Sequence, residues 1–189
     1  MNAWKMPVAW MSMVALLVGG CNKDEQNVAP TDDNEAITTA TLTLVNKAVP
    51  TDTVRATIEN LNTTADFSKA TLNLKANTTY TGTIGLLDKT KTPVVDATEE
   101  IREKVNEHLF VYTYSATSGS QNALIVTITD KDTNPAPGPY PVGLSTDMQT
   151  GAAGTGTLNV VLRHQPNVKD GTPNPGSSDL DTSFPVVIQ

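Results

Sequence analysis

Apolar and polar residues alternate with a period of two along most of the chain, which is the spacing of a strand with one buried face. In the first half the alternation runs from Leu42 to Leu44, Val54 to Ile58, Leu72 to Leu74 and Tyr80 to Leu86. Threonine takes many of the polar positions, and its β-branched side chain suits the solvent face of a half-buried strand. These segments predict sheet with one face in water.

The second half of the chain repeats the pattern. Alternating segments run from Phe110 to Tyr114, Leu124 to Ile128, Leu158 to Leu162 and Phe184 to Ile188, and a short edge strand is predicted from Val142 to Thr146. Proline-rich and glycine-rich stretches separate several of these segments, and such residues are typical of turns and loops.

One segment, residues 96–108, breaks the alternation and predicts a helix of about three turns. Asp96 or Thr98 can cap its first turn, where acidic residues also favour the helix dipole. An apolar stripe at helical spacing ends at His108, which we place at the C-terminus of the helix. There the partial negative charge of the helix end is expected to favour the protonated form of His108.

Many short strands, one short helix and no βαβ rhythm predict an all-β fold. We expect residues 37–189 to form a single antiparallel β-sandwich of Ig-like or transthyretin-like type with one short helix. An up-and-down barrel is the alternative architecture. We find no internal repeat of fixed period.

The N-terminal residues 1–20 are typical of a lipoprotein signal peptide. The apolar run from Pro7 to Val18 is shorter than the ~20 residues that a membrane span requires, and small residues precede the single cysteine, Cys21. Cys21 is therefore the predicted lipidation site, and its lipid is the predicted contact with the membrane. Residues 21–36 contain little to bury and predict a flexible, lipid-anchored tether.

Several stretches resemble a family of small, uncharacterised lipoproteins of the Bacteroidota. The segments that carry the resemblance are Asn34–Leu44, Asn77–Ile84, Asp96–Ile101, Asn106–Phe110, Gly151–Leu158 and His164–Pro166. The residues after the cysteine, Lys23-Asp24-Glu25, resemble the short signal that sends such lipoproteins to the cell surface. The resemblance implies an outer-membrane lipoprotein that faces either the cell surface or the periplasm.

Some members of that family are called type 1 periplasmic-binding-fold proteins. That fold requires two lobes of repeated βα units and about twice this length, so the β pattern of the chain argues against it.

Composition excludes several function classes. The formal net charge is −7, which disfavours nucleic acid and anionic lipid headgroups as partners. Lipidation of Cys21 leaves no thiol for a disulfide, a metal–sulfur site or cysteine catalysis. The chain also contains no Gly-x-Ser-x-Gly elbow and no His-Glu-x-x-His segment, and we expect no enzymatic activity.

Two groups of residues are candidates for binding a metal ion. Asp130 and Asp132 begin a run with oxygen ligands at alternate positions, as in a calcium loop, although prolines replace the glycine and glutamate that such a loop needs. His164 and Asp130 each end the inward stripe of a strand, and with His108 they could hold a transition metal if they converged. The alternative is a structural role, with His108 capping the helix and His164 hydrogen-bonded at the rim.

The sequence therefore favours a lipid-anchored binding or accessory module of the cell envelope without catalytic activity, serving an outer-membrane transporter protein. A metal- or cation-capturing lipoprotein using His108, Asp130, Asp132 and His164 is the first alternative. A structural or adhesive surface protein is the second. No cofactor is required apart from a divalent cation in the first alternative, and the small-molecule ligand is not identified.

Overall fold

The structure is a computed structural model that describes Met1 and residues 36–189. The signal peptide, Cys21 and the tether expected from the sequence lie outside the described residues, apart from their end residues Met1 and Ala36. The described residues 36–189 belong to one compact unit.

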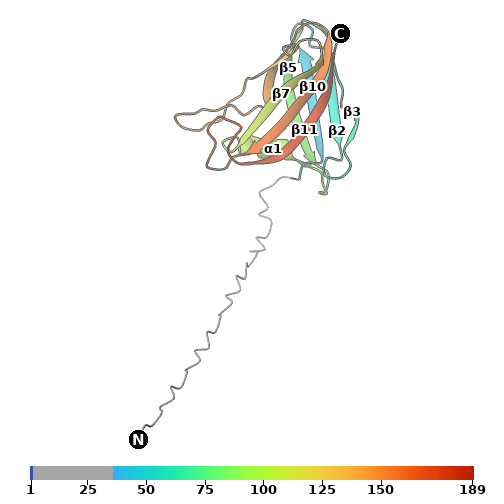
Figure 1. Cartoon of the computed structure of the whole chain (residues 1–189). Coiled ribbons are helices and arrows are strands. Elements are labelled where there is room, and N and C mark those ends of the chain that lie inside the picture. Colours follow the sequence, from blue (N-terminus) through green and yellow to red (C-terminus); the bar gives the residue numbers. More distant parts are fainter. Residues whose placement is uncertain (2–35) are drawn as a thin grey trace. The chain divides into compact units, whose positions relative to one another are not determined.

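Two β-sheets form this unit (Figure 1). The larger sheet contains β1 (Thr39–Asn46), β2 (Thr53–Glu59), β3 (Asp66–Lys69), β5 (Thr79–Asp88), β6 (Val95–Asp96), β8 (Leu124–Ile128) and β9 (Ser145–Thr150). Its strands follow the order β3-β2-β1-β5-β9-β8, and β6 pairs with β5. The smaller sheet contains β4 (Leu72–Leu74), β7 (His108–Ser118), β10 (Gly154–His164) and β11 (Ser177–Ile188), in the order β4-β11-β10-β7.

The prediction of an all-β, sandwich-like fold with one short helix is confirmed. Both sheets are open, so the barrel alternative is wrong. Each strand pair is antiparallel except β4 with β11, which is parallel. This exception arises because β4 is a three-residue segment that leaves the larger sheet after β3 and joins the edge of the smaller one.

The inner faces of the two sheets form one core. Leu42, Ile58 and Leu86 come from the larger sheet and Leu158 and Phe184 from the smaller, and each is fully buried. These side chains occupy the apolar positions of the sequence alternation, so the alternation identifies the inner face of each strand correctly. Burial of such side chains removes about 1.5–3 kcal/mol of unfavourable hydration each and is the main source of stability.

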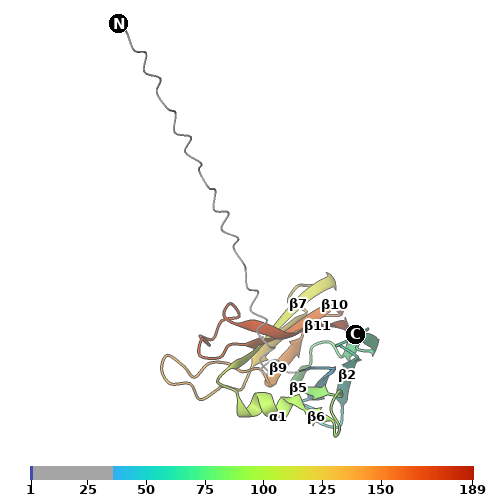
Figure 2. The ribbon, with the colours of Figure 1, turned by 90° about the horizontal axis from the view of Figure 1, so that it is seen from below.

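The helix α1 spans Ala97–Glu103 and lies beside β5 and β6 (Figure 2). Asp96 caps it as predicted, because its Oδ1 accepts a hydrogen bond of 2.9 Å from the backbone N–H of Thr98. The helix is shorter than predicted, since it ends at the C-cap residue Lys104. His108 is therefore the first residue of β7 and not a helix residue.

No helix in the described part of the chain is long and apolar enough to cross a membrane.

The predicted edge strand from Val142 to Thr146 is also corrected. The strand is β9, which begins at Ser145 and lies between β5 and β8 within the larger sheet. The sequence of β9 lacks a clear apolar–polar alternation, because two of its inward side chains are threonines, Thr146 and Thr150. The buried hydroxyl of Thr150 has a hydrogen-bond partner, because it donates to the carbonyl of Lys75 at 2.6 Å.

Candidate metal site

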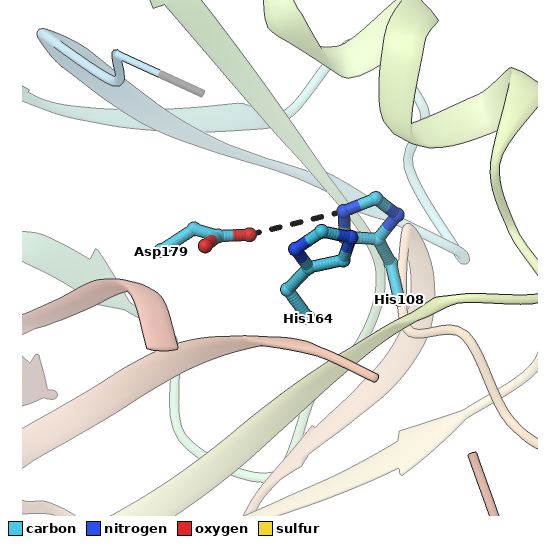
Figure 3. A group of neighbouring side chains, drawn as sticks. All are labelled: His108, His164 and Asp179. Atoms are coloured by element: carbon cyan, nitrogen blue, oxygen red, sulfur yellow. Dashed lines mark ion pairs between the residues drawn. The ribbon is translucent and has the colours of Figure 1, made fainter. Parts of the chain in front are cut away.

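Three potential metal ligands meet at one end of the smaller sheet: His108, His164 and Asp179 (Figure 3). Each offers one ligand atom, and these atoms lie within 4.8 Å of one another. This is the one such group of three or more His, Cys, Asp or Glu side chains within the described residues. They come from the start of β7, the end of β10 and the start of β11.

Strand pairing brings the two histidines together. His108 on β7 is the direct antiparallel partner of His164 on β10, and side chains at such positions lie on the same face about 5 Å apart. His164 continues the buried row of Leu158, Val160 and Leu162, so it faces inward as the alternation predicts. The two rings stack with centroids 4.8 Å apart and planes 8° apart.

Asp179 reaches the site through an irregularity in the pairing of β10 with β11. Leu162 pairs with Leu180, but the next residue, Arg163, pairs with Ser178, so Asp179 is left without a partner as in a β-bulge. Simple alternation from the buried Leu180 would place Asp179 on the outer face. Its side chain is instead 0 % exposed. Bulges commonly re-aim one side chain in this way, and the bulge gives the site its carboxylate.

The Nδ1 atom of His108 lies 3.0 Å from the carbonyl oxygen of Lys104. Because a carbonyl can only accept, Nδ1 carries the hydrogen, and in the neutral ring Nε2 is left with a lone pair. His108 is 1 % exposed, and its Nε2 has no hydrogen-bond partner among the described residues. Metal-binding histidines commonly show this arrangement, in which a carbonyl fixes the ring and directs the other nitrogen toward the ion.

Asp179 faces that nitrogen. Its Oδ2 lies 3.8 Å from Nε2 of His108, too far for a hydrogen bond, and neither carboxylate oxygen has a hydrogen-bond partner in the described part of the chain. A buried acceptor without a donor costs about 1–3 kcal/mol, and more when it is charged. A lone pair and a carboxylate that face each other without a proton donor between them are suited to a shared cation.

Burial shifts both groups away from their charged forms. It lowers the pKa of His108 below its ordinary value, although the hydrogen bond to the Lys104 carbonyl opposes the shift. The expectation that His108 ends the helix and is protonated there is therefore corrected, because His108 begins β7 and its burial outweighs the hydrogen bond to the Lys104 carbonyl. Burial also raises the pKa of Asp179, against the attraction of His164 and Arg163. A neutral imidazole is the form that binds metal.

Glu107 lies at the outer side of the cluster. Its Oε2 is 3.7 Å from Nε2 of His164, and its side chain is 38 % exposed compared with 10 % for His164. The structure thus brings the carboxylate of Glu107 beside His164. Exposure therefore decreases from Glu107 through His164 to the buried pair of His108 and Asp179.

Asp130 and Asp132 lie away from this cluster. The carboxylate of Asp130 accepts the backbone N–H groups of Gly143 and Leu144 at 2.9 and 3.0 Å. That of Asp132 accepts from the backbone of Tyr140 at 2.7 Å and from the ammonium of Lys169 at 2.9 Å. Both carboxylates are thus occupied by donors of the chain itself, and Lys169 supplies the positive charge that a calcium loop would take from an ion.

The sequence does not mark Asp179 as a ligand, because the stretch before it contains glycine and proline residues typical of a loop. The one signal that pointed to Asp179 is its position directly before the buried alternation that begins at Leu180.

Gly176, in the loop between β10 and β11, lies directly against the backbone of His164. Gly176 has a φ of +78°, and a Cβ there would overlap the carbonyl oxygen of His164. The replacement Gly176→Ala should lower the free energy of unfolding by about 1–3 kcal/mol through backbone strain alone, with a further loss from the overlap. Urea unfolding measures this change in the free energy of unfolding.

Gly85→Ala is the matched control, since a Cβ at Gly85 meets nothing within 4 Å. We expect it to leave stability unchanged or to raise it by up to about 1 kcal/mol. Equal effects at Gly85 and Gly176 would show that the approach of the loop to His164 is not tight.

A groove of about 440 Å³ lies between α1 and the outer face of the larger sheet, and its lining includes none of the three candidate ligands. Two of its three charged residues have partners: Arg102 pairs with Glu99, and Asp96 caps the helix. The cluster at His108, His164 and Asp179 is therefore the stronger candidate site.

Comparison of the chain with known protein families, with curated proteins and with solved structures finds no match.

Proposed function

We propose that the protein is a lipid-anchored binding module of the cell envelope that captures a divalent transition-metal ion at His108, His164 and Asp179. One observation carries the proposal. The Nε2 of His108 and both oxygens of Asp179 are buried without hydrogen-bond partners in the described part of the chain, and Oδ2 of Asp179 lies 3.8 Å from that Nε2. An ion between them satisfies all three atoms at once.

The donor set selects the class of metal. Two imidazoles and one carboxylate suit zinc, copper, nickel or ferrous iron, whereas calcium requires six to eight oxygen ligands. Zinc held by nitrogen and oxygen at about 2.0–2.2 Å keeps its ligand atoms about 3.3 Å apart, so a small inward movement of the side chains is sufficient. Because lone pairs of parallel, stacked rings do not converge, we expect the His108–His164 stack to break when the ion binds.

Burial argues for capture in preference to catalysis. The side chains of Asp179 and His108 are 0 % and 1 % exposed, which leaves a substrate no access to the inner side of the ion. A catalytic zinc site usually keeps an open position for water and substrate.

Isothermal calorimetry of the full chain in detergent tests the proposal. We expect zinc to bind at one site per chain and calcium to give no heat. Asp179→Ala should abolish the zinc heat, because it removes the buried carboxylate. Asp181→Asn, an exposed carboxylate two residues along β11, is the matched control and should bind zinc as the wild type does. Absence of heat with zinc, copper, nickel and ferrous iron in the wild type would overturn the proposal.

The location of the protein rests on the sequence. The acylated Cys21 would hold the domain at the outer membrane, on the surface or the periplasmic side, where a captured ion could be passed to an outer-membrane transporter. Two or three acyl chains make such attachment effectively permanent, since each buried methylene contributes ~0.8 kcal/mol.

Cys21→Ala should release the protein from the membrane fraction, because no acyl chain can then be attached. Fractionation followed by immunoblotting measures the release. Retention of the variant in the membrane fraction would contradict the lipid anchor, while zinc binding by the domain should be the same in both proteins.

A further inference from the structure

A polar pocket opens beside the candidate metal site. It has a volume of about 340 Å³ and is lined by Asn106, Glu107, Asn134, Asn167 and Lys169. These residues come from the connection between α1 and β7 and from the two long loops that follow β8 and β10. Asn134, Asn167 and Glu107 contribute side-chain oxygen atoms, which are ligands that hydrated cations accept, whereas the side-chain oxygen of Asn106 already accepts from Thr133.

Glu107 belongs both to this pocket and to the surroundings of the metal site. It lines the pocket, and its Oε2 lies 3.7 Å from Nε2 of His164, the most exposed of the three ligands. The position of Glu107 is fixed by pairing of its backbone, since its carbonyl accepts the N–H of Gln165 at 2.6 Å. Glu107 therefore connects the pocket with His164.

The charge of the pocket also favours cations. Its one basic residue, Lys169, is turned away from solvent with its side chain 1 % exposed. The ammonium group is 2.9 Å from the carboxylate of Asp132 and donates to the carbonyl of Val105 at 2.8 Å. Lys169 is thus neutralised by Asp132, and Glu107 dominates the field at the mouth. Carboxylates at the mouth of a cleft raise the local concentration and association rate of cations.

We infer that this asparagine-lined pocket is the route by which a divalent cation reaches the buried site, and that Glu107 is the transfer ligand that passes the ion to His164. This inference rests on the proposed metal capture. It assigns Glu107 a role in the rate of binding, whereas the three buried ligands determine the affinity.

Stopped-flow mixing of the full chain in detergent with Co²⁺, followed by its visible absorption, measures the association rate. Glu107→Gln should slow association by about tenfold or more, because the field and the first ligand are lost. Its dissociation rate should fall in parallel, so that the Kd changes much less than either rate. Glu103→Gln removes the same charge from the exposed end of α1 and should associate at the wild-type rate.

The outcomes separate the inference from the function on which it rests. If the wild type takes up no cobalt or zinc, the proposed function fails. If the wild type binds but Glu107→Gln associates as fast as Glu103→Gln, the route through Glu107 is wrong and capture stands. If Glu107→Gln loses equilibrium binding to the extent that Asp179→Ala does, Glu107 is a permanent ligand and its transfer role is overturned.

Discussion

Asp179→Asn should make the metal-free protein more stable while it abolishes zinc binding. The amide replaces a buried carboxylate that has no donor. Its N–H₂ group can donate to the lone pair on Nε2 of His108 after a movement of about 1 Å, which shortens the 3.8 Å separation to hydrogen-bond distance. We expect the free energy of unfolding to rise by about 1–3 kcal/mol, the usual cost of leaving a buried polar group unsatisfied. Urea unfolding in the presence of a chelator measures this change.

Zinc should reverse the order of the two proteins. Zinc at 1,000 times its Kd stabilises the native state by about 4.1 kcal/mol, more than the expected difference between the two proteins, so the wild type gains this amount and Asp179→Asn gains none. Asp181→Asn should match the wild type with and without zinc. A loss of stability in metal-free Asp179→Asn would contradict the account, because it would mean that the carboxylate is already satisfied within the protein. Residues that destabilise a fold and bind a ligand are typical of functional sites.

Lys169→Met should lower the free energy of unfolding by about 3–5 kcal/mol, which is the usual effect of removing one partner of a buried ion pair. Lys169 and Asp132 are 1 % and 0 % exposed, so the carboxylate would be left buried without its cation. Lys169 also holds the β10–β11 loop to the carbonyl of Val105, which lies three residues before His108 at the start of β7. Zinc affinity should therefore fall as well, because this loop leads to Asp179.

The same ion pair makes a prediction about acid unfolding. Burial alone would raise the pKa of Asp132, but the hydrogen bonds from Lys169, Tyr140 and Asn134 outweigh it and lower the pKa below the ordinary 3.8. A lowered pKa stabilises the folded state above pH 3.8, and that contribution is lost as the pH falls through the folded value. In Lys169→Met the pKa of Asp132 rises, so the loss of folding stability in acid should begin at a higher pH.

Lys131→Met, at an exposed lysine directly before Asp132 in the sequence, is the control and should change stability by less than about 0.5 kcal/mol. The double variant Asp132→Asn with Lys169→Met should recover part of the loss, because no unpaired charge is then buried. Equal stability of Lys169→Met and the wild type would show that the pair is exposed to solvent.

Local pattern was sufficient for much of the fold. Alternation identified the inner faces of most strands, including the inward position of His164, and Asp96 was recognised as the helix cap. Such features depend on residues close in sequence, whose spacing reports which face is buried. Pattern failed for β9, whose inward positions include Thr146 and Thr150, and for the parallel pairing of β4.

The candidate site depends on features that local pattern does not contain. The pairing of His108 with His164 is set by the register of β7 against β10, over 50 residues apart in the sequence. Asp179 enters through one unpaired residue on β11, and a shift of one residue turns a side chain to the opposite face. The partner of Asp132 is likewise a lysine from a distant loop, and it supplies the charge that sequence reasoning assigned to calcium.

X-ray absorption spectroscopy at the zinc edge of the zinc-loaded full chain tests the central claim most directly. The account predicts two imidazole nitrogens at about 2.0–2.1 Å and one carboxylate oxygen at a similar distance, with the imidazole signal reduced in His164→Ala. A shell of oxygen atoms without imidazole, or a spectrum unchanged by Asp179→Ala and His164→Ala, would contradict a metal site formed by His108, His164 and Asp179.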